Sequence, residues 1–569
     1  MADQISLLNE KYRNLLSIAF GFSIFSNLLK LTGPLFMLQV YDRVLGSRSV
    51  ETLTALFTLI TVLFILFGAL EFARSRVIAR IGVRLQTAMN IPVFNAVLRA
   101  FAKKQNTLGA SSALQDLSAI ATFFASPVIL TFFDALWTPI FFLAIFTFHP
   151  LLGWLSVCGG GVLVLAALSN QFLTFRKISL AQQQSNTAAT IAGQIEAGSD
   201  IIFSQAMGTA MAQRWQNELE TGNSNSLRAS DINGLFSAFT KSFRLLLQSA
   251  MLALGAWLVL QNEITAGAMI AGSILMGAAL APIEQGISQW KIAQKARIGW
   301  KNLSDFLRLH PETSSPMDLP APDANLTAKN ITLFSLSGEK PVLQNVSFEL
   351  NTGEVLGIIG KSGSGKTTLL RVLMGLLAPT QGDVRLGGAT LQQYSSDQLG
   401  KMVGYMPQNT QLFGGTVAEN IAHMSMSPDP KRVAAAAQQA GIHQTIMALP
   451  QGYDTQITPH GFQLSGGQKQ RISLARTLFH EPLILLLDEP SSSLDALGLQ
   501  ALESTISNMK ANGKSVIIVG HRPSALSQCD KLLVLQDGKP TAYGPRDTVL
   551  HQTTQNAEDS LRIVRGSTL

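Results

Sequence analysis

Long apolar stretches separated by short polar turns dominate the first half of the chain. A helix needs roughly 17–25 mostly apolar residues to cross about 30 Å of hydrocarbon. The pattern predicts six membrane-spanning helices, over residues 15–39, 52–70, 126–148, 150–175, 245–260 and 264–283. Because the number of crossings is even, both ends of the chain are expected on the same side of the membrane.

Polar residues in two of these regions affect where the predicted spans begin and end and how their side chains are interpreted. Residues 135–175 carry no formal charge, but His149-Pro150 falls where a turn would divide them into a hairpin. The first helix of that hairpin is too short unless it begins before Asp134, near Ser126. Lys30 lies inside the first span. One interpretation is that its side chain snorkels to the membrane surface. We favour the other, in which it faces the helix bundle or a water-filled path and has a functional role.

The distribution of basic residues predicts the orientation. The connection between spans two and three holds seven Lys or Arg residues and that between spans four and five holds six, whereas the turns at His149 and Asn262 hold none. Cytoplasmic connections are enriched in Lys and Arg. Both termini and both long connections are therefore predicted to be cytoplasmic, although Arg43 and Arg48 in the first outer connection weaken the bias.

The second half of the chain has a different pattern, in which short apolar runs are separated by glycines. Such a pattern is typical of strands alternating with helices. Residues 311–323 are rich in Pro, Ser and Asp, as expected of a linker. The sequence thus predicts a membrane domain over residues 1–310, a linker over 311–323 and an α/β domain over 324–569.

Composition agrees with a membrane protein. Hydrophobic residues make up 47% of the chain and charged residues 14%, against roughly 25% charged in a soluble domain. The net charge of +7 includes no run of five like charges, which favours basic residues facing the cytoplasm over a nucleic-acid patch. Cys158 and Cys529 alone provide no disulfide framework or zinc cluster. A cleavable signal peptide is the alternative for the first apolar run, but its continuation past Lys30 favours a retained span.

The stretch "VLGIIGKSGSGKTTLLRVL" reads as a buried strand, a glycine loop and the start of a helix. Its spacing fits the phosphate-loop pattern in full. Glycines let the backbone N–H groups point at phosphates, and the helix N-terminus adds favourable partial charge. Lys366 would reach the β- and γ-phosphates and the Thr367 hydroxyl would bind Mg²⁺. The candidate nucleotide-binding residues of this loop are Gly360, Ser362, Gly363, Ser364, Gly365, Lys366, Thr367 and Thr368.

A second candidate element is "LILLLDEP", an apolar strand that ends in two carboxylates. A buried parallel strand presents its terminal residues at the edge where the phosphate loop opens. Asp488 is then placed to hold Mg²⁺, and Glu489 to take a proton from the attacking water. A solvated strand end is an equally good interpretation of "DE" by itself, and only the upstream loop makes the functional one strong.

With these elements the second half resembles the ABC ATPases. "YMPQ" looks like their glutamine loop, "LSGGQ" like their signature loop, "SSLD" like the loop after the acidic pair, and "VGHRPS" like the switch-histidine segment. The resemblance implies that Gln408 contacts nucleotide and Mg²⁺, that Asp495 belongs to the D-loop and that His521 is catalytic. The sequence departs from the family near Ser335, where an aromatic residue is expected to stack on adenine. Phe334 is the nearest aromatic residue, and a buried strand phenylalanine is an equal alternative.

The signature loop of this superfamily acts on ATP held by a second copy of the domain. The residues that match it are Leu464, Ser465, Gly466, Gly467 and Gln468. Ser465 and the amides that follow it at a helix start would form a second anion cradle. The resemblance therefore implies a homodimer with two ATP molecules between the copies and Mg²⁺ at each site.

An ABC ATPase behind six spans resembles the exporters, and shorter strings resemble the inner-membrane ABC component of type I secretion systems, particularly the branch exporting proteases. These strings are "LTGPLFMLQVYDRVLGSRSVETL", "WTPIFF", "AMGTAMAQRW" and "HRPS". The resemblance implies ATP-driven export of an unfolded protein with an uncleaved C-terminal signal across the inner membrane of a Gram-negative bacterium. It also implies a periplasmic membrane-fusion adaptor, an outer-membrane tunnel protein, surrounding membrane lipid and a cargo that is often Gly- and Asp-rich and calcium-binding.

Two alternatives and two further expectations complete the sequence analysis. The alternatives are a lipid, peptide or drug exporter of the same architecture, and a soluble ABC ATPase acting on DNA, which the uncharged residues 135–175 disfavour. We therefore expect no nucleic-acid partner. In exporters, short transverse helices in the long connections rest on the ATPase domains, and the candidate stretches here are residues 106–117 and 202–215. About a dozen residues without Cys precede the first span, so cargo processing by a cysteine peptidase domain is not expected.

Overall fold

The computed structural model describes residues 2–103, 107–311, 319–335, 340–458, 464–491, 494–520 and 526–552. Backbone contacts divide the chain into two compact units, Met1–Thr313 and Ser314–Leu569. The predicted linker falls at this division, and most of it lies outside the described residues. Its boundaries at 311 and 323 stay a prediction.

The first unit is helical. Within the described residues, six helical segments are long and apolar enough to span a membrane, namely Asn14–Ser47, Val50–Ala102, Val128–Phe146, Pro150–Ala197, Gly208–Leu260 and Ala266–Ser288. This confirms the six predicted spans. The elements in chain order are α1 (Ala2–Lys30), α2 (Thr32–Gln39), a π-helix (Val40–Val44), α3 (Leu45–Ser47), α4 (Val50–Ala102), α5 (Thr107–Ala125), α6 (Val128–Ala135), α7 (Thr138–Phe146), α8 (Pro150–Ala197), α9 (Ser199–Ser204), α10 (Gly208–Leu260), α11 (Ala266–Ser288) and α12 (Trp290–Leu309).

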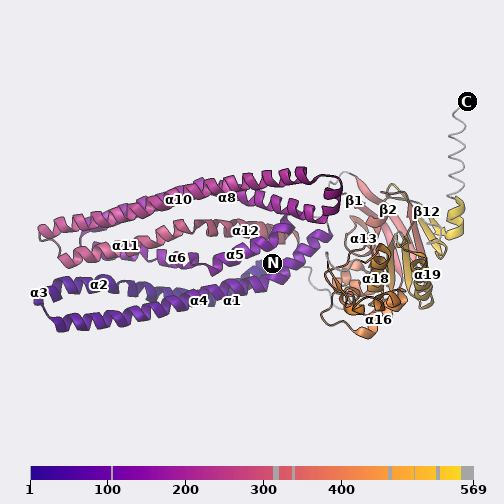
Figure 1. Ribbon diagram of the computed structural model, residues 1–569, viewed down its shortest axis with the longest axis horizontal. Helices are drawn as coiled ribbons and strands as arrows, with labels where there is room; N and C mark the ends of the chain where they lie inside the picture. The colour runs from indigo at the N-terminus through magenta and orange to yellow at the C-terminus, as the bar shows by residue number, and fades with distance from the viewer. Residues whose placement is uncertain are drawn as a thin grey trace, which may run out of the picture. The chain divides into compact units, whose positions relative to one another are not determined.

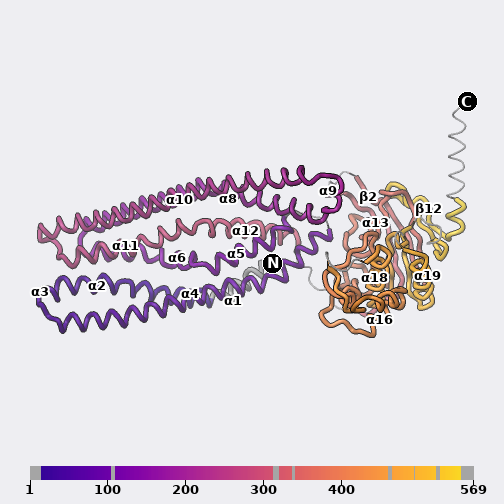
Figure 2. The backbone as a smooth tube through the Cα atoms, viewed as in Figure 1, coloured from indigo at the N-terminus to yellow at the C-terminus, as the bar shows by residue number. Residues whose placement is uncertain are grey.

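Three of these helices are far longer than a membrane crossing requires. Helices α4 and α10 have 53 residues each and α8 has 48, which at 1.5 Å per residue gives lengths of about 70–80 Å. Most of the two long connections is therefore a continuation of the spans. Helices α8 and α10 pack along each other (Figure 1) and are joined by the short helix α9, which lies inside the turn visible in Figure 2.

The third span begins before Asp134, as its length required, but it is broken in the middle. Helix α6 starts at Val128 and ends at Ala135, and α7 begins two residues after Leu136, with a proline in its first turn. A proline fits the first turn because that position needs no N–H donor. The break leaves Asp134 near the end of a short helix, facing α1 and α4.

The two predicted contact stretches differ in structure. Residues 202–215 include the end of α9 and the turn before α10 and so contain a short helix. The described part of residues 106–117 instead opens α5, a 19-residue helix that continues to Ala125 and packs on α4 and α12. The helix there is longer than expected, and its contact with the ATPase domain stays a prediction.

The second unit contains a six-stranded sheet, an antiparallel four-stranded sheet and a small two-stranded ribbon among its described residues. The six-stranded order is β12-β11-β3-β10-β9-β6, parallel except for β12, and the four-stranded order is β2-β1-β4-β5. The strands are β1 (Leu326–Phe334), β2 (Pro341–Leu350), β3 (Val355–Gly360), β4 (Gln381–Leu386), β5 (Ala389–Thr390), β6 (Val403–Met406), β7 (Gly415–Thr416), β8 (Gln456–Ile457), β9 (Ile484–Asp488), β10 (Ser515–Val519), β11 (Lys531–Gln536) and β12 (Lys539–Pro545).

The parallel strands are buried on both faces, which explains their continuous apolar runs. Every residue of β9 and β10 is buried, as is usual when helices or a second sheet cover both sides. One face packs on the four-stranded sheet and on two helices, α13 and α14, and the other packs on five helices, α15 to α19. These helices are α13 (Lys366–Leu373), α14 (Ser396–Met402), α15 (Val417–Ile421), α16 (Pro430–Gln439), α17 (His443–Met447), α18 (Gly466–Leu478) and α19 (Ala496–Ala511).

Candidate functional site

The phosphate loop connects β3 to α13, as the sequence predicted. Gly363 and Gly365 have φ angles of 81° and 96°, in the left-handed region that glycine adopts without steric cost. A Cβ on Gly360 would lie 2.2 Å from the carbonyl oxygen of Leu535. Glycine is thus required at these three positions, and Ser362 lies exposed between them on the outer side of the loop.

The side chain of Lys366 folds over this loop. Its Nζ donates hydrogen bonds to the carbonyl oxygens of Gly360 and Lys361, at 2.7 and 2.8 Å. Burial lowers the pKa of the ammonium, while the carboxylates of Glu489 and Asp488 act in the opposite direction. A cation in this cradle, at a helix N-terminus, suits a bound polyphosphate.

The carboxylates lie at the same sheet edge. Asp488 ends β9 and is 2% exposed, and the Thr367 hydroxyl donates a hydrogen bond to it. Burial raises the pKa of Asp488 and the Glu489 charge adds to the rise, whereas Thr367, Lys366 and Arg371 lower it. Asp488 Oδ2 is buried and has no hydrogen-bond partner among the described residues. An unused carboxylate oxygen beside a threonine hydroxyl matches the oxygen ligands that Mg²⁺ prefers.

Glu489 is held in a fixed direction beside Asp488. Its φ is 50°, which is uncommon for a residue other than glycine and costs conformational energy. Its amide donates to the Val519 carbonyl at 2.9 Å, and Gln408 Nε2 donates to its Oε2 at 2.7 Å. The structure thus brings Gln408 to the candidate base, while the role of Gln408 toward Mg²⁺ stays a prediction.

The signature residues form the capped N-terminus of α18. Ser465 Oγ accepts from the Gln468 amide at 3.2 Å, and Gln468 Oε1 accepts from the Ser465 amide at 2.9 Å. This is a capping box, in which serine and glutamine satisfy each other's backbone N–H groups. The amides of Gly466 and Gly467 in the first turn have no carbonyl within the helix to bind. They are available to an anion, while the buried Leu464 anchors the loop to the core.

Arg471, which sequence reasoning did not single out, connects the signature helix to two other elements. Its Nη2 lies 3.7 Å from Oδ2 of Asp495, and its Nη1 donates to the Gly441 carbonyl at 3.2 Å. Asp495 in turn caps α19 by accepting from the Gly498 amide at 2.8 Å. The guanidinium therefore links α18 to Asp495, the residue predicted to belong to the D-loop. The sequence shows only an arginine a few residues after "LSGGQ" and does not indicate these contacts.

Four predicted site residues remain to be placed. His521 lies outside the described residues. Phe334 ends β1 with its side chain 41% exposed and pairs with Pro341, so its adenine contact stays a prediction. Thr368 follows Thr367 in the first turn of α13, and Ser364 is buried with an Oγ that has no partner among the described residues. The Ser364 hydroxyl thus remains available within the loop.

Comparison with known proteins supports this interpretation over the whole chain. A family model described as ABC transporter matches residues 343–492, and one described as ABC transporter transmembrane region matches residues 16–283. The chain is 36% identical over 542 residues to the type I secretion system ATP-binding protein PrsD of Rhizobium meliloti (strain 1021), covering 95% of this chain and 93% of PrsD. The chain belongs to the ABC transporters of type I secretion systems.

Two further comparisons agree with this membership. The transporter is 28% identical over 555 residues to the leukotoxin translocation ATP-binding protein LktB of Mannheimia haemolytica, covering 96% of this chain and 77% of LktB. The structure of a bacterial Atm1-family ABC exporter with ATP bound superimposes with a TM-score of 0.80 over 97% of this chain and 99% of that one. Because its sequence identity is 22%, this last similarity concerns the fold alone.

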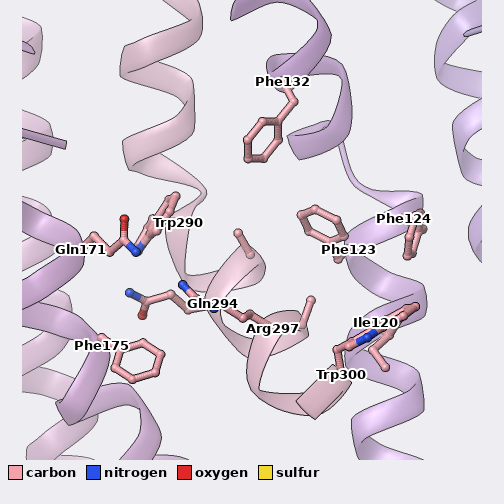
Figure 3. A pocket seen from close by; sticks show the side chains of 12 residues that line it. Ile120, Phe123, Phe124, Phe132, Gln171, Phe175, Trp290, Gln294, Arg297 and Trp300 are labelled. Carbon is pink, nitrogen blue, oxygen red and sulfur yellow. The ribbon is translucent and has the colours of Figure 1, made fainter. Parts of the chain in front are cut away.

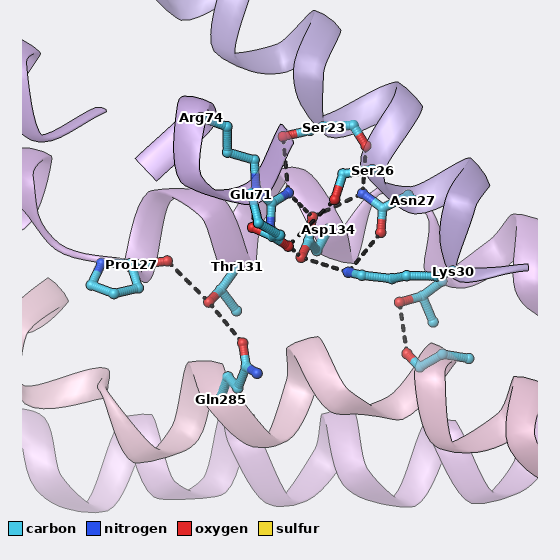
Figure 4. A network of polar contacts seen from close by, with 12 residues as sticks. Ser23, Ser26, Asn27, Lys30, Glu71, Arg74, Pro127, Thr131, Asp134 and Gln285 are labelled. Carbon is cyan, nitrogen blue, oxygen red and sulfur yellow. Dashed lines mark hydrogen bonds and ion pairs between the residues drawn. The ribbon is translucent and has the colours of Figure 1, made fainter. Parts of the chain in front are cut away.

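The membrane unit of the transporter contains a buried charged network between α1, α4 and α6 (Figure 4). Lys30 Nζ donates to Asp134 Oδ2 at 2.9 Å, and Arg74 Nη1 donates to Asp134 Oδ1 at 2.7 Å. Arg74 also binds Glu71, and Asn27 donates to Asp134 at 2.8 Å. Lys30 therefore faces the helix bundle rather than snorkelling. The two positive charges of Lys30 and Arg74 equal the two negative charges of Asp134 and Glu71. A buried charge is costly unless it is paired, so this pairing allows the network to lie inside the helix bundle.

Proposed function

We propose that this transporter uses ATP to export an unfolded polypeptide with an uncleaved C-terminal signal across the inner membrane of a Gram-negative bacterium. The similarity to PrsD over 95% of the chain carries the proposal. It is supported by an ATPase unit whose phosphate loop, acidic pair and signature helix are all intact. A lipid, peptide or drug exporter is the less favoured function, since PrsD and LktB are both named for secretion or toxin translocation.

The proposed nucleotide site extends across two copies of the chain. In one copy the loop from Gly360 to Thr368 would hold the triphosphate, with Lys366 on the β- and γ-phosphates. The second copy would close over the γ-phosphate with Ser465 and the amides of Gly466 and Gly467. Two separate anion cradles per chain favour this arrangement, because a single triphosphate satisfies both only when two copies meet.

The residues at the sheet edge would carry out the hydrolysis. Thr367 and Asp488 would hold Mg²⁺, with Gln408 as a further ligand, and the ion would neutralise charge on the phosphates. Glu489 would accept the proton of the attacking water as its oxygen bonds to the γ-phosphorus and the bond to ADP breaks. His521 would stabilise the transferred group, and Asp495 would connect the two sites.

Export further requires coupling and partners. Closure of the ATPase units would move the long helices through α9, as a population shift driven by nucleotide. The positive residues of the long connections support a cytoplasmic ATPase unit. A periplasmic adaptor and an outer-membrane tunnel protein would complete the system, with a secreted Gly- and Asp-rich, calcium-binding polypeptide as the proposed cargo.

The proposal is tested by comparing culture media. Cells that express the wild-type transporter should release a polypeptide that cells with Lys366→Ala do not, because this change removes the cation that binds the phosphates. Lys401→Ala is the matched control, since Lys401 is an exposed lysine on α14, outside the nucleotide site. Identical media from wild-type and Lys366→Ala cells, combined with an altered lipid or drug content, would favour the alternative function.

A further inference from the structure

The membrane unit contains an aromatic cavity that the ATPase mechanism does not use. It has a volume of about 370 Å³ and is lined from α5, α6, α8 and α12, within the range of small-molecule pockets, roughly 300–1,000 Å³. Figure 3 shows Phe123, Phe132 and Phe175 around it, with Trp290, Gln294 and Arg297 on α12. All of these residues belong to the membrane unit.

The depth of this cavity can be estimated from helix lengths. Phe132 is 17 residues from the turn at His149, and Trp290 is 25 residues from the turn at Thr265. At 1.5 Å per residue these separations correspond to about 26 and 38 Å. The hydrocarbon core is about 30 Å thick. The cavity therefore lies where the spans leave the membrane on the side of the long connections, which is the side from which a cytoplasmic polypeptide would enter.

Two buried polar groups in this aromatic wall lack hydrogen-bond partners. Gln294 is 2% exposed, and although its Nε2 donates to Thr174 Oγ1 at 3.3 Å, its Oε1 has no partner among the described residues. The indole N–H of Trp290 is likewise buried without a partner in that part of the chain. Buried polar groups are normally hydrogen-bonded. The cavity thus needs an occupant that offers both a donor and an acceptor.

A peptide group provides this combination. Each peptide unit has one N–H donor and one C=O acceptor, the complements of the Gln294 carbonyl and the Trp290 indole N–H. The acyl chains and ester groups of a phospholipid provide acceptors but no donor, so a lipid would have to place its charged or hydroxylated headgroup in this aromatic cavity. The aromatic rings suit a large apolar side chain, and Arg297, whose guanidinium carbon lies 5.9 Å from the centre of the Phe175 ring, disfavours a neighbouring Lys or Arg.

We propose that this cavity binds an extended segment of the exported polypeptide, with one large apolar side chain against the aromatic rings and its peptide group bonded to Gln294 and Trp290. The inference rests on the proposed function of protein export and names the site at which cargo is first held. It assigns to α12 a role in cargo selection in addition to connecting the membrane unit to the linker.

Photo-crosslinking identifies the occupant directly. Phe175 is replaced by p-benzoylphenylalanine in cells that secrete the polypeptide found by the comparison of media, and adducts formed on irradiation are identified by mass spectrometry. Phe172, one turn earlier on α8, is 79% exposed and does not line the cavity, so it provides the matched control position. The proposal expects the secreted polypeptide in adducts at 175 and not at 172. Adducts at 175 with phospholipid alone, or with a second copy of the transporter alone, would overturn it.

A binding measurement tests the polar pair. In purified transporter in phosphatidylethanolamine and phosphatidylglycerol nanodiscs, Gln294→Leu should raise the concentration of that unfolded polypeptide needed for half-maximal ATPase stimulation about tenfold. Phe172→Ala should leave this concentration unchanged. An unchanged value for Gln294→Leu would refute the role of the polar pair. If wild-type cells export no polypeptide, the proposed function itself fails, whereas export with crosslinks elsewhere refutes this cavity alone.

Discussion

Glu489 combines an uncommon backbone conformation with a fixed side chain. The Val519 carbonyl binds its amide and Gln408 binds its carboxylate, so the direction of the candidate base is set by β10 and by the segment after β6. A residue held this way against conformational cost points to a functional constraint. Replacing the Glu489 carboxylate should therefore affect ATP hydrolysis more than ATP binding.

We expect Glu489→Gln to preserve ATP binding but to lower phosphate release by at least about 10²-fold, because an amide cannot accept the proton. Nucleotide should then remain trapped in a closed dimer. Phosphate release and retention of labelled ATP measure this result, with the exposed Glu503→Gln on α19 as control. Turnover close to the wild-type rate would assign the base to another residue.

Asp116 on α5 makes stability depend on pH. It is buried against α12, and burial raises its pKa to about 6, although Asn302 and Ser112 act in the opposite direction through hydrogen bonds. Because the pKa in the folded state lies above the usual value for aspartate, ionisation there costs free energy. The stability that Asp116 contributes is present at low pH and is lost as the pH rises through about 6.

Asp116→Asn should therefore raise the free energy of unfolding relative to wild type at pH 8, by up to about 3 kcal/mol, and by about half as much at pH 5, because the penalty develops between the ordinary pKa of aspartate and about 6. Thermal unfolding of the purified transporter at the two pH values checks the difference. The exposed Asp305→Asn on α12 should show little effect at either. An equal gain at both pH values would mean that burial does not raise the pKa of Asp116.

At the scale of elements, the charged network joins helices that the sequence separates by about a hundred residues. Asp134 accepts from Lys30, Arg74 and Asn27, so α6 is tied to α1 and α4 through one carboxylate. Asp134→Asn should cost up to about 3–5 kcal/mol of stability, because the half-buried Lys30 loses its carboxylate partner and the buried Arg74 is left with Glu71 alone. Unfolding of the purified transporter in detergent measures this loss.

A second variant distinguishes the network from simple packing. Lys30→Met combined with Asp134→Asn should destabilise the transporter by less than the sum of the two single changes, since the network is already broken in each. Additive effects would instead show that Lys30 and Asp134 act independently. Comparison of culture media from cells with wild-type transporter and with Lys30→Met shows whether Lys30 is also needed for export. The sequence analysis favoured such a functional role for Lys30.

At the scale of the whole molecule, the proposed dimer predicts a complementation pattern. Chains with Ser465→Arg retain an intact phosphate loop, and chains with Lys366→Ala retain an intact signature helix. If these elements act across copies, a mixed dimer has one working site and should regain up to about half of the wild-type ATPase activity. Each homodimer should be nearly inactive.

The measurement uses the two variants with different affinity tags, purified sequentially so that only mixed dimers remain. A mixed dimer without activity would mean that both elements act on the ATP of their own chain. Hydrolysis at the wild-type rate by an isolated single copy would contradict the shared site altogether. Wild-type dimers assembled from differently tagged chains provide the control for the purification.

The sequence by itself determined the elements whose signals are local. Six spans follow from apolar runs of sufficient length, because every backbone polar group in lipid must bond within its own helix. The phosphate loop and the acidic strand end follow from glycine and carboxylate spacing within a few residues. Gly365 and Lys366 are recognisable because the conformation and charge that they supply are needed in that immediate segment.

Tertiary structure alone decided the contacts between distant segments. The sequence indicated neither that Gln408 holds Glu489, nor that Arg471 joins α18 to Asp495, nor that Lys30 binds Asp134. Each of these contacts depends on which strands are neighbours or how helices pack, and a residue's own neighbourhood in the chain carries no such information. The cavity beside Gln294 is of the same kind, since its lining comes from four separate helices that must come together before it exists.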